Sequence, residues 1–267
     1  MDVSIVILNY KTAKLVAQCI KGIRSISPQV SYEIIVVDNN SGERDLAILR
    51  QIKDINLIIN QSNDGFAKGN NKGLRQARGK YVLVMNPDIV LLEGAVDKLA
   101  QYLNQHSNVG IVGPKLLNPD RTLQYSSYRF PHPMTWVYRR TVLGRASFGK
   151  KELRRFTMMD WDHNNTKDVD WLLAACIMIR VEVLQKLNYF DERFFMYLED
   201  TDLSRRCWEI GYKVVYFPEA EVVHYYQRLS AKNLGLKSLF DKPTRIHIYS
   251  AIKYFMKYKG KALPRQV

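Results

Sequence analysis

Two phosphate-binding loops and a membrane-spanning segment are absent from this sequence. No GxGxxG follows the first apolar run, so a dinucleotide fingerprint is missing, and no GxxxxGK[ST] occurs, so a P-loop is excluded. No apolar run is long enough to span a bilayer. The opening residues, MDVSIVILNY, are too short and lack the basic flank of a signal peptide. We therefore expect a cytoplasmic protein without a glycine-loop nucleotide site.

Cysteine and acidic residues are also scarce. The three cysteines, Cys19, Cys176 and Cys207, lie in helical or apolar surroundings without paired spacing, which indicates buried thiols of a reducing compartment. The chain has 26 acidic residues against 40 lysines and arginines, a formal net charge of +14. Such an excess favours an anionic partner: nucleic acid, a phosphorylated substrate or an anionic membrane surface.

The first half of the chain alternates apolar runs with helical patterns. Strands are expected at Val3–Leu8, Glu33–Val37 and Asn56–Ile59, from Tyr81 up to Asn86-Pro87-Asp88, and at Val109–Pro114. Helices of about ten residues are expected between them. This alternation indicates βαβ units, and hence an α/β fold with a mostly parallel sheet flanked by helices.

Polar residues follow the expected strands. They are Asn9-Tyr10, Asp38-Asn39, Asn63-Asp64 and Asn86 to Asp88. Because the carboxyl ends of parallel strands meet at one edge of a sheet, we expect these side chains to line a nucleotide-sized cleft. Pro87 has no N–H to give a sheet, so its strand ends and Asp88 lies just beyond it. A diphosphate beside carboxylates requires a bridging divalent cation.

The regular pattern stops between Asn118 and about Asp170. Aromatic and basic residues interleave there, which fits sugar recognition, a membrane-facing flap or stacking of single-stranded nucleic acid. No nucleic-acid module surrounds this stretch, so a nucleic-acid partner is not expected. Order returns with an apolar segment at Val169–Arg180 and a short helix that ends near Leu187.

Three carboxylates open the next expected helix. Glu199, Asp200 and Asp202 lie in its first turn, behind an aromatic run, and the helix ends at Gly211. A helix dipole favours acidic residues at this end, but it accounts for one carboxylate more readily than for three. The sequence therefore marks this turn as a candidate site.

Two short strands and a basic helix are expected at the end of the chain. The strands are Lys213–Phe217 and Glu221–Tyr225, and the second carries His224. A lone strand histidine is usually a core residue. From about Thr244 to Lys259, aromatic and aliphatic residues alternate with lysines at helical spacing. This pattern is typical of a helix in a membrane interface, or of one docked on its own domain with its lysines in water; we favour the membrane.

Together these stretches resemble the family 2 glycosyltransferases of GT-A fold, in particular their rhamnosyltransferase-like branch. The resemblance extends from Val3 to about Ser230 and rests on five motifs in order: Asn9-Tyr10, VVDNNS at 36–41, NDGFAKGNNKG at 63–73, Asn86-Pro87-Asp88 and FDERFFMYLEDTDLSRR at 190–206. It implies one GT-A domain, with a nucleotide-sugar half at 1–118 and an acceptor-binding and catalytic half at 119–240. A basic amphipathic segment follows at 241–267.

The resemblance implies a role for each matching position. Asp200 would be the catalytic base, with Glu199 as the alternative, and Asp88 and His224 would hold Mg²⁺ or Mn²⁺. Asn86 replaces the first carboxylate of the family's DxD motif, so Asp88 is the one strong ligand there. Nucleotide contacts are implied for Asn9, Tyr10, Asp38 (on the base), Asn63, Phe66, Asn71 and Asn86, and acceptor contacts for Trp171, Asp191 and Tyr197.

The implied reaction moves L-rhamnose from dTDP-L-rhamnose, with inversion, to a growing polysaccharide or lipid-linked oligosaccharide at the inner membrane face. A carboxylate takes the proton of the acceptor hydroxyl, and a divalent ion stabilises the leaving diphosphate. A UDP-hexose or UDP-galactofuranose transferase of the same fold stays open. So do a nucleotidyltransferase, although its glycine-rich loop is missing, and a non-catalytic module for nucleic acid or an anionic membrane.

Overall fold

The computed structural model describes residues 1–225 and 241–265. In the first half, strands and helices alternate as the sequence predicts. The strands are β1 (Val3–Asn9), β2 (Tyr32–Asp38), β3 (Asn56–Ile59), β4 (Tyr81–Met85), β5 (Ile89–Leu91) and β6 (Val109–Leu117). The helices are α1 (Ala13–Ser25), α2 (Glu43–Leu49), α3 (Gly65–Leu74) and α4 (Ala95–Gln105). Strand β5 is not among the predicted strands; it begins directly after the turn at Pro87.

The second half departs from the prediction in two places. The stretch at 118–170 is not irregular, because it holds the helices α5 (Pro133–Arg140) and α6 (Ser147–Phe156), the 3₁₀ turn η1 (Val142–Arg145), and the short strands β7 (Leu123–Gln124), β8 (Ser127–Tyr128) and β9 (Lys167–Asp168). These helices are too short and too basic to show an apolar period over a window of about 11 residues. The two strands expected near His224 are one strand, β12 (Lys213–His224), with a bulge between Phe217 and Glu221.

The remaining elements are β10 (Trp171–Leu172), β11 (Cys176–Arg180), α7 (Val181–Lys186), α8 (Glu199–Glu209) and α9 (Lys242–Lys257). The main sheet has the order β3-β2-β1-β4-β11-β6-β12-β5. Strands β3, β2, β1 and β4 pair in parallel, whereas β11 runs antiparallel to both β4 and β6. The α/β class is confirmed, but the sheet is mixed, and β4 has a parallel neighbour on one side only.

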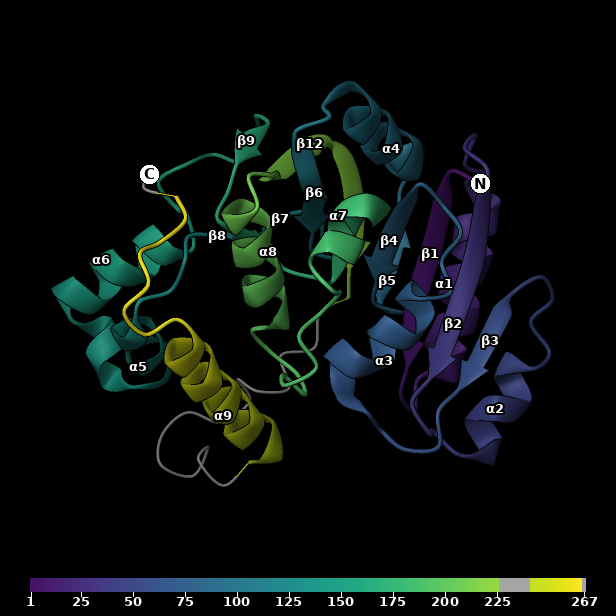
Figure 1. The fold of residues 1–267 in the computed structure, drawn as a ribbon, viewed down its shortest axis with the longest axis horizontal. Helices are drawn as coiled ribbons and strands as arrows, with labels where there is room; N and C mark the ends of the chain where they lie inside the picture. The colour runs from purple at the N-terminus through teal and green to yellow at the C-terminus, as the bar shows by residue number, and fades with distance from the viewer. Residues whose placement is uncertain (226–240, 266–267) are drawn as a thin grey trace.

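Alternate side chains of the strands feed two apolar cores, one on each face of the sheet. Helices α1 and α4 cover one face, where Ile5, Ile7 and Leu99 are buried. Helices α3, α7 and α8 cover the other, where Val6 and Leu203 are buried (Figure 1). The polar loops after β1, β2 and β4 consequently meet at one edge of the sheet, as the sequence predicts.

Helix α9 forms as predicted, and one of its faces packs on the domain. Asp202, in the first turn of α8, is fully buried and accepts hydrogen bonds from Lys257 Nζ, from Tyr258 Oη at 2.8 Å and from Arg206 Nε at 2.7 Å. Two cations and a hydroxyl thus compensate one buried carboxylate, and the cluster ties α9 to α8. Within residues 1–225 and 241–265, no helix combines the length and apolarity that crossing a bilayer needs. The predicted boundary at residue 240 lies outside the described residues.

We predict that Asp202→Asn lowers the free energy of unfolding by about 3 kcal/mol, because the cations of Arg206 and Lys257 lose the buried charge that they face. Chemical denaturation would measure the change. The matched control is Glu43→Gln, which removes an exposed carboxylate paired with Arg50 and should alter stability little. Equal stabilities for Asp202→Asn and the unmodified protein would show that α9 docks without this cluster.

Candidate active site

The turn after β4 brings Asp88 to His224. Strand β5 pairs antiparallel with β12, so that Ile89 lies opposite His224, and the Tyr225 N–H donates to the Asp88 carbonyl at 2.9 Å. Oδ1 of Asp88 lies 3.5 Å from Nε2 of His224. The histidine side chain is buried, whereas 26% of the Asp88 side chain is exposed. The structure thus brings together the two residues predicted as metal ligands.

A chain of amides behind His224 determines which ring nitrogen carries the proton. Asn118 donates its side-chain N–H groups to Thr122 and to the Leu123 carbonyl, so its Oδ1 accepts from Gln124 Nε2 at 2.9 Å. Oε1 of Gln124 therefore faces Nδ1 of His224, at 2.6 Å. Nδ1 therefore donates to that oxygen, and in the neutral form of the ring the lone pair lies on Nε2, the nitrogen that faces Asp88.

This pair has the chemistry of a divalent-cation site. Oδ1 of Asp88 is buried and accepts no hydrogen bond from any residue that the structure describes. A carboxylate and an imidazole are common ligands of divalent metals. Among the described residues, no third histidine, cysteine or carboxylate completes a metal cluster. The two residues fit a cation that takes its other ligands from a bound diphosphate and water.

A buried pair of carboxyl groups lies at the start of α8. Leu198 has a left-handed backbone, with φ of 64°, and this sharp turn makes the helix begin at Glu199. Burial raises the pKa of Asp200 to about 6, although the Thr201 N–H donates to it at 2.7 Å. Burial and then the charge of Asp200 raise the pKa of Glu199 well above its ordinary value. Near neutral pH, Asp200 is therefore the charged member and the better base.

One short loop joins this carboxylate to the turn that carries Asp88. The Ala174 N–H lies 3.4 Å from Oδ2 of Asp200, and the carbonyl of the next residue, Ala175, accepts from the Asn86 N–H at 2.8 Å. Strand β11 begins at Cys176, which lies opposite Met85 of β4. The candidate base and the candidate cation site are therefore held by the backbone of two adjacent residues in the middle of the sheet.

The predicted nucleotide contacts after β1 and β2 divide into buried and exposed residues. Asn9 and Asp38 are fully buried; Asn9 Nδ2 donates to Asp38 Oδ1 at 2.7 Å, and Asp38 Oδ2 accepts from the Ser41 N–H at 3.0 Å. This arrangement ties the two loops together. Tyr10 is 43% exposed, and a hydrogen bond with Asn63 lowers the pKa of its hydroxyl. Tyr10 and Asn63 thus lie together at the rim, where they are accessible to a ligand.

Helix α3 connects the two predicted halves of the domain. The Asn71 amide is fully buried and bonds both backbone groups of Phe190, at 2.8 and 3.0 Å. The Phe66 ring packs edge-on against the Phe190 ring. The backbone N–H of Phe66 donates a hydrogen bond to the Phe195 carbonyl at 2.6 Å. At Gly65, φ is +78° and an added Cβ would lie 2.2 Å from that carbonyl. These contacts support the 190–195 segment, and the nucleotide roles of Asn71 and Phe66 stay predictions.

The residues predicted to bind the acceptor are all in contact with other parts of the chain. Trp171 is 5% exposed and stacks on Tyr128 at 4.4 Å between ring centroids, which favours a supporting position. Burial tends to raise the pKa of Asp191, but hydrogen bonds from Arg193 and Lys257 hold it below its ordinary value. Tyr197 stacks on a ring of α9. Their contacts with an acceptor stay predictions.

The sequence matches the family described as Glycosyl transferase family 2 over residues 4–187. This chain belongs to that family. It is 30% identical over 213 residues to the low-salt glycan biosynthesis hexosyltransferase Agl10 of Haloferax volcanii, covering 77% of this chain and 61% of that protein. It is 24% identical to the N-acetylglucosaminyl-diphospho-decaprenol L-rhamnosyltransferase of Mycobacterium tuberculosis (75% of this chain, 69% of that protein) and to rhamnosyltransferase WbbL of Escherichia coli (84% and 81%).

These relatives confirm the predicted resemblance to family 2 enzymes of the rhamnosyltransferase-like branch, and membership makes the chain a glycosyltransferase. Solved structures confirm the GT-A fold. The chain superposes on the mannosyltransferase PcManGT of Pyrobaculum calidifontis, in complex with GDP-Man and Mn²⁺, with a TM-score of 0.61, 16% identity and coverage of 98% of this chain and 66% of that one. For GalNAc-T7 with UDP, GalNAc and Mn²⁺ the TM-score is 0.64, with 14% identity and coverage of 85% and 44%.

Sequence reasoning missed several residues around the site of this family 2 glycosyltransferase. Gln124 lies in a segment expected to be irregular, and no motif marks it as the partner of His224. Ala174 and Ala175 act through their backbone groups, which the side-chain pattern does not reveal. Lys257 was expected to face water or lipid, yet it bonds Asp191 and Asp202. These contacts depend on tertiary structure alone.

Gln124→Leu should weaken Mn²⁺ binding about ten-fold or more, because His224 loses the acceptor that orients its ring and tautomer. Free Mn²⁺ measured by electron paramagnetic resonance, with dTDP present, would give the affinity. Gln18→Leu, at an exposed position of α1, is the matched control, and His224→Ala provides the baseline without the imidazole ligand. If Gln124→Leu and Gln18→Leu bind Mn²⁺ equally well, Gln124 does not orient the histidine.

Proposed function

We propose that this chain is an inverting glycosyltransferase that moves L-rhamnose from dTDP-L-rhamnose to an oligosaccharide or lipid-linked acceptor. One observation carries the proposal: a buried carboxylate with a pKa of about 6, Asp200, is held one loop away from a cation pair, Asp88 and His224. A base and a leaving-group site on either side of a space for a sugar are what a single displacement requires. We place the enzyme in the cytoplasm, at the inner face of the membrane.

Asp200 takes the proton of the attacking hydroxyl. A sugar hydroxyl is too weak an acid to ionise near neutral pH, so its proton must leave as the new bond forms. Thr201 donates to Oδ1 of Asp200, which leaves its second oxygen, Oδ2, with only a long contact from Ala174. Burial and the charge of Asp200 raise the pKa of the neighbouring Glu199, which disfavours a second negative charge beside Asp200. The acceptor hydroxyl therefore binds at Oδ2.

Asp88 and His224 would hold a divalent cation beside the leaving diphosphate. A divalent cation bound there supplies positive charge to the diphosphate oxygens as the glycosidic bond breaks. The Mn²⁺ named with two structures of similar fold supports a divalent cation for this reaction. Asn86 and Tyr10 contribute polar contacts to the nucleotide, and the buried amide of Asn9 and carboxylate of Asp38 keep the loops in position.

The donor sugar is proposed from the named activities of similar proteins. Three similar proteins are named as rhamnosyl transferases, while the relative at 30% identity is a hexosyltransferase, which supports a UDP-hexose as the second candidate. A thermal-shift panel of dTDP, UDP and GDP with Mn²⁺ or chelator separates them, because a ligand that binds only the folded state raises Tm. Metal-dependent stabilisation by dTDP above UDP is expected. Preference for UDP would overturn the rhamnose donor.

Asp200→Asn should reduce turnover about 10²- to 10⁴-fold, because the acceptor loses its base. Binding of dTDP, measured by calorimetry, should stay unchanged, since Asp200 faces the acceptor. Glu199→Gln is the matched control: it keeps an uncharged side chain where a protonated acid stands, so it should retain far more activity. Turnover by Asp200→Asn within a few-fold of the unmodified enzyme would refute the base assignment.

The rate of sugar transfer should also rise with pH across the acidic range. The pKa of Asp200 is raised to about 6, so the carboxyl is protonated and inactive below that pH and becomes a base above it. The profile of kcat/KM should therefore reach half its plateau near pH 6, rather than near pH 4 as for an exposed aspartate. A profile that is flat from pH 5 to pH 8 would contradict a base in this environment.

A further inference from the structure

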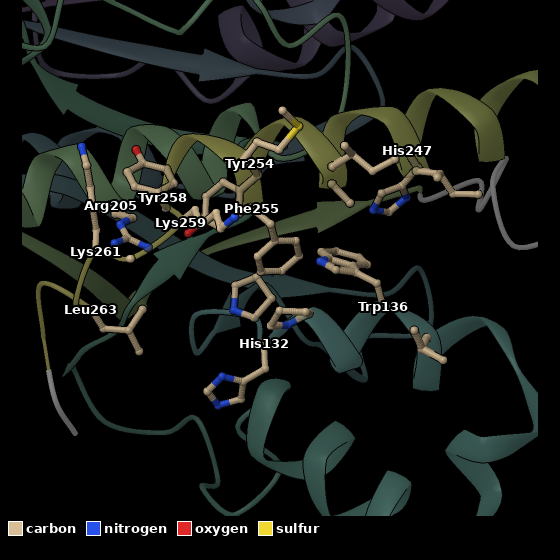
Figure 2. Close-up of a pocket in the computed structure, with 18 of the residues that line it drawn as sticks. His132, Trp136, Arg205, His247, Tyr254, Phe255, Tyr258, Lys259, Lys261 and Leu263 are labelled. Atoms are coloured by element: carbon tan, nitrogen blue, oxygen red, sulfur yellow. The ribbon is translucent and has the colours of Figure 1, made fainter.

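An apolar groove runs between α5 and α9, away from the polar residues of the active site. Its volume is about 940 Å³, and its walls include Trp136 and Val137 of α5 and Ile252, Phe255 and Met256 of α9. Figure 2 shows side chains of α9 facing Trp136 and His132 across the opening. A cavity of this size is in the range that holds a small apolar ligand.

Large apolar side chains are exposed along both walls. Of the residues in the groove, Met256 is 72% exposed, Ile252 is 50% exposed, and Val137 and Leu263 are each 37% exposed. Exposed apolar side chains also lie on η1 and α6, which follow α5 directly: Val142, Leu143 and Phe148. In Figure 1 these helices gather at the end of the molecule opposite α2 and β3. Contiguous apolar surface of this kind marks a site of interaction with another molecule.

The same two segments carry most of the net charge. Residues 133–156 and residues 241–265 each contain seven lysines or arginines and one acidic residue, a formal +6 apiece. Together they account for +12 of the chain's +14. Lys259 and Lys261 lie at the groove itself. An apolar groove bordered by positive charge complements a molecule with a hydrocarbon chain and an anionic head, and a purely polyanionic partner would leave the groove unfilled.

We propose that residues 133–156 and 241–265 dock together on an anionic lipid bilayer, and that the groove between α5 and α9 receives the hydrocarbon chain of the lipid diphosphate that carries the acceptor sugar. The identity of that lipid as the acceptor rests on the proposed function. The inner face of α9 supports the connection: Ser250 bonds the Met196 carbonyl, and Lys253 and Lys257 bond the segment at 191–193. Helix α9 thus lies between the groove and residues 191–196, the segment that precedes Asp200 in the chain.

Vesicle flotation tests the docking surface without donor or transfer, so it can fail independently of the proposed function. The protein should float with phosphatidylcholine vesicles that contain phosphatidylglycerol, and bind vesicles of phosphatidylcholine alone much more weakly. Ile252→Glu and Met256→Glu, both at exposed positions, should each weaken partitioning about ten-fold or more. Leu15→Glu, an exposed leucine of α1 far from the groove, is the matched control and should bind normally.

Farnesyl diphosphate tests the groove itself. With chelator present to remove any bound cation, farnesyl diphosphate should bind and change the fluorescence of Trp136, whereas inorganic diphosphate should not. Ile252→Glu should abolish this change. Trp136→Phe should remove the fluorescence signal itself. Vesicle binding without any farnesyl diphosphate binding would overturn the chain site. Equal loss of vesicle binding in Leu15→Glu would overturn the docking surface. A dimer that Ile252→Glu dissociates, with no vesicle binding, would assign the groove to a second copy of the chain.

Discussion

The backbone groups of two adjacent residues, Ala174 and Ala175, hold the two halves of the candidate active site at a constant spacing. The N–H of Ala174 points to the carboxylate of Asp200, and the carbonyl of Ala175 receives the N–H of Asn86, two residues before Asp88. Because β11 starts directly after them in the centre of the sheet, this loop cannot shift without breaking strand pairs with β4. The distance between base and cation site is thus a property of the sheet.

The three carboxylates at the start of α8 show how surroundings separate chemically similar groups. Asp202 is matched by Arg206 and Lys257 and serves to dock α9. Glu199 is buried, its Oε2 has no hydrogen-bond partner among the described residues, and burial raises its pKa well above the ordinary value, which favours its neutral form. Asp200, with its pKa raised to about 6, is charged at neutral pH and can still accept a proton. One turn of helix therefore holds the residue that docks α9, an acid whose neutral form is favoured, and the candidate base.

Much of this arrangement could be predicted from local sequence, because strand ends and turns are local features. Pro87 has no N–H to donate to a sheet, so it ends β4 whichever strands lie beside it. An apolar run such as Val3–Leu8 is suited to burial on both faces, so it pairs in the interior of a sheet. The direction of β11 and the union of two strands into β12 depend on pairing between distant segments, which no local pattern carries. The partnership of His224 with Gln124 is of the same kind, as is the burial of Asn71 against Phe190. Helices α5 and α6 were missed because they are too short and too basic to show an apolar period.

The central claim is that Asp200 and the cation pair lie on opposite sides of the sugar, so that transfer is a single displacement. The anomeric configuration of the first product, measured by proton nuclear magnetic resonance before any equilibration, tests this claim most directly. Complete inversion relative to the donor sugar is expected. Retention would require a covalent intermediate or attack from the leaving-group side, and it would contradict the roles assigned to Asp200, Asp88 and His224.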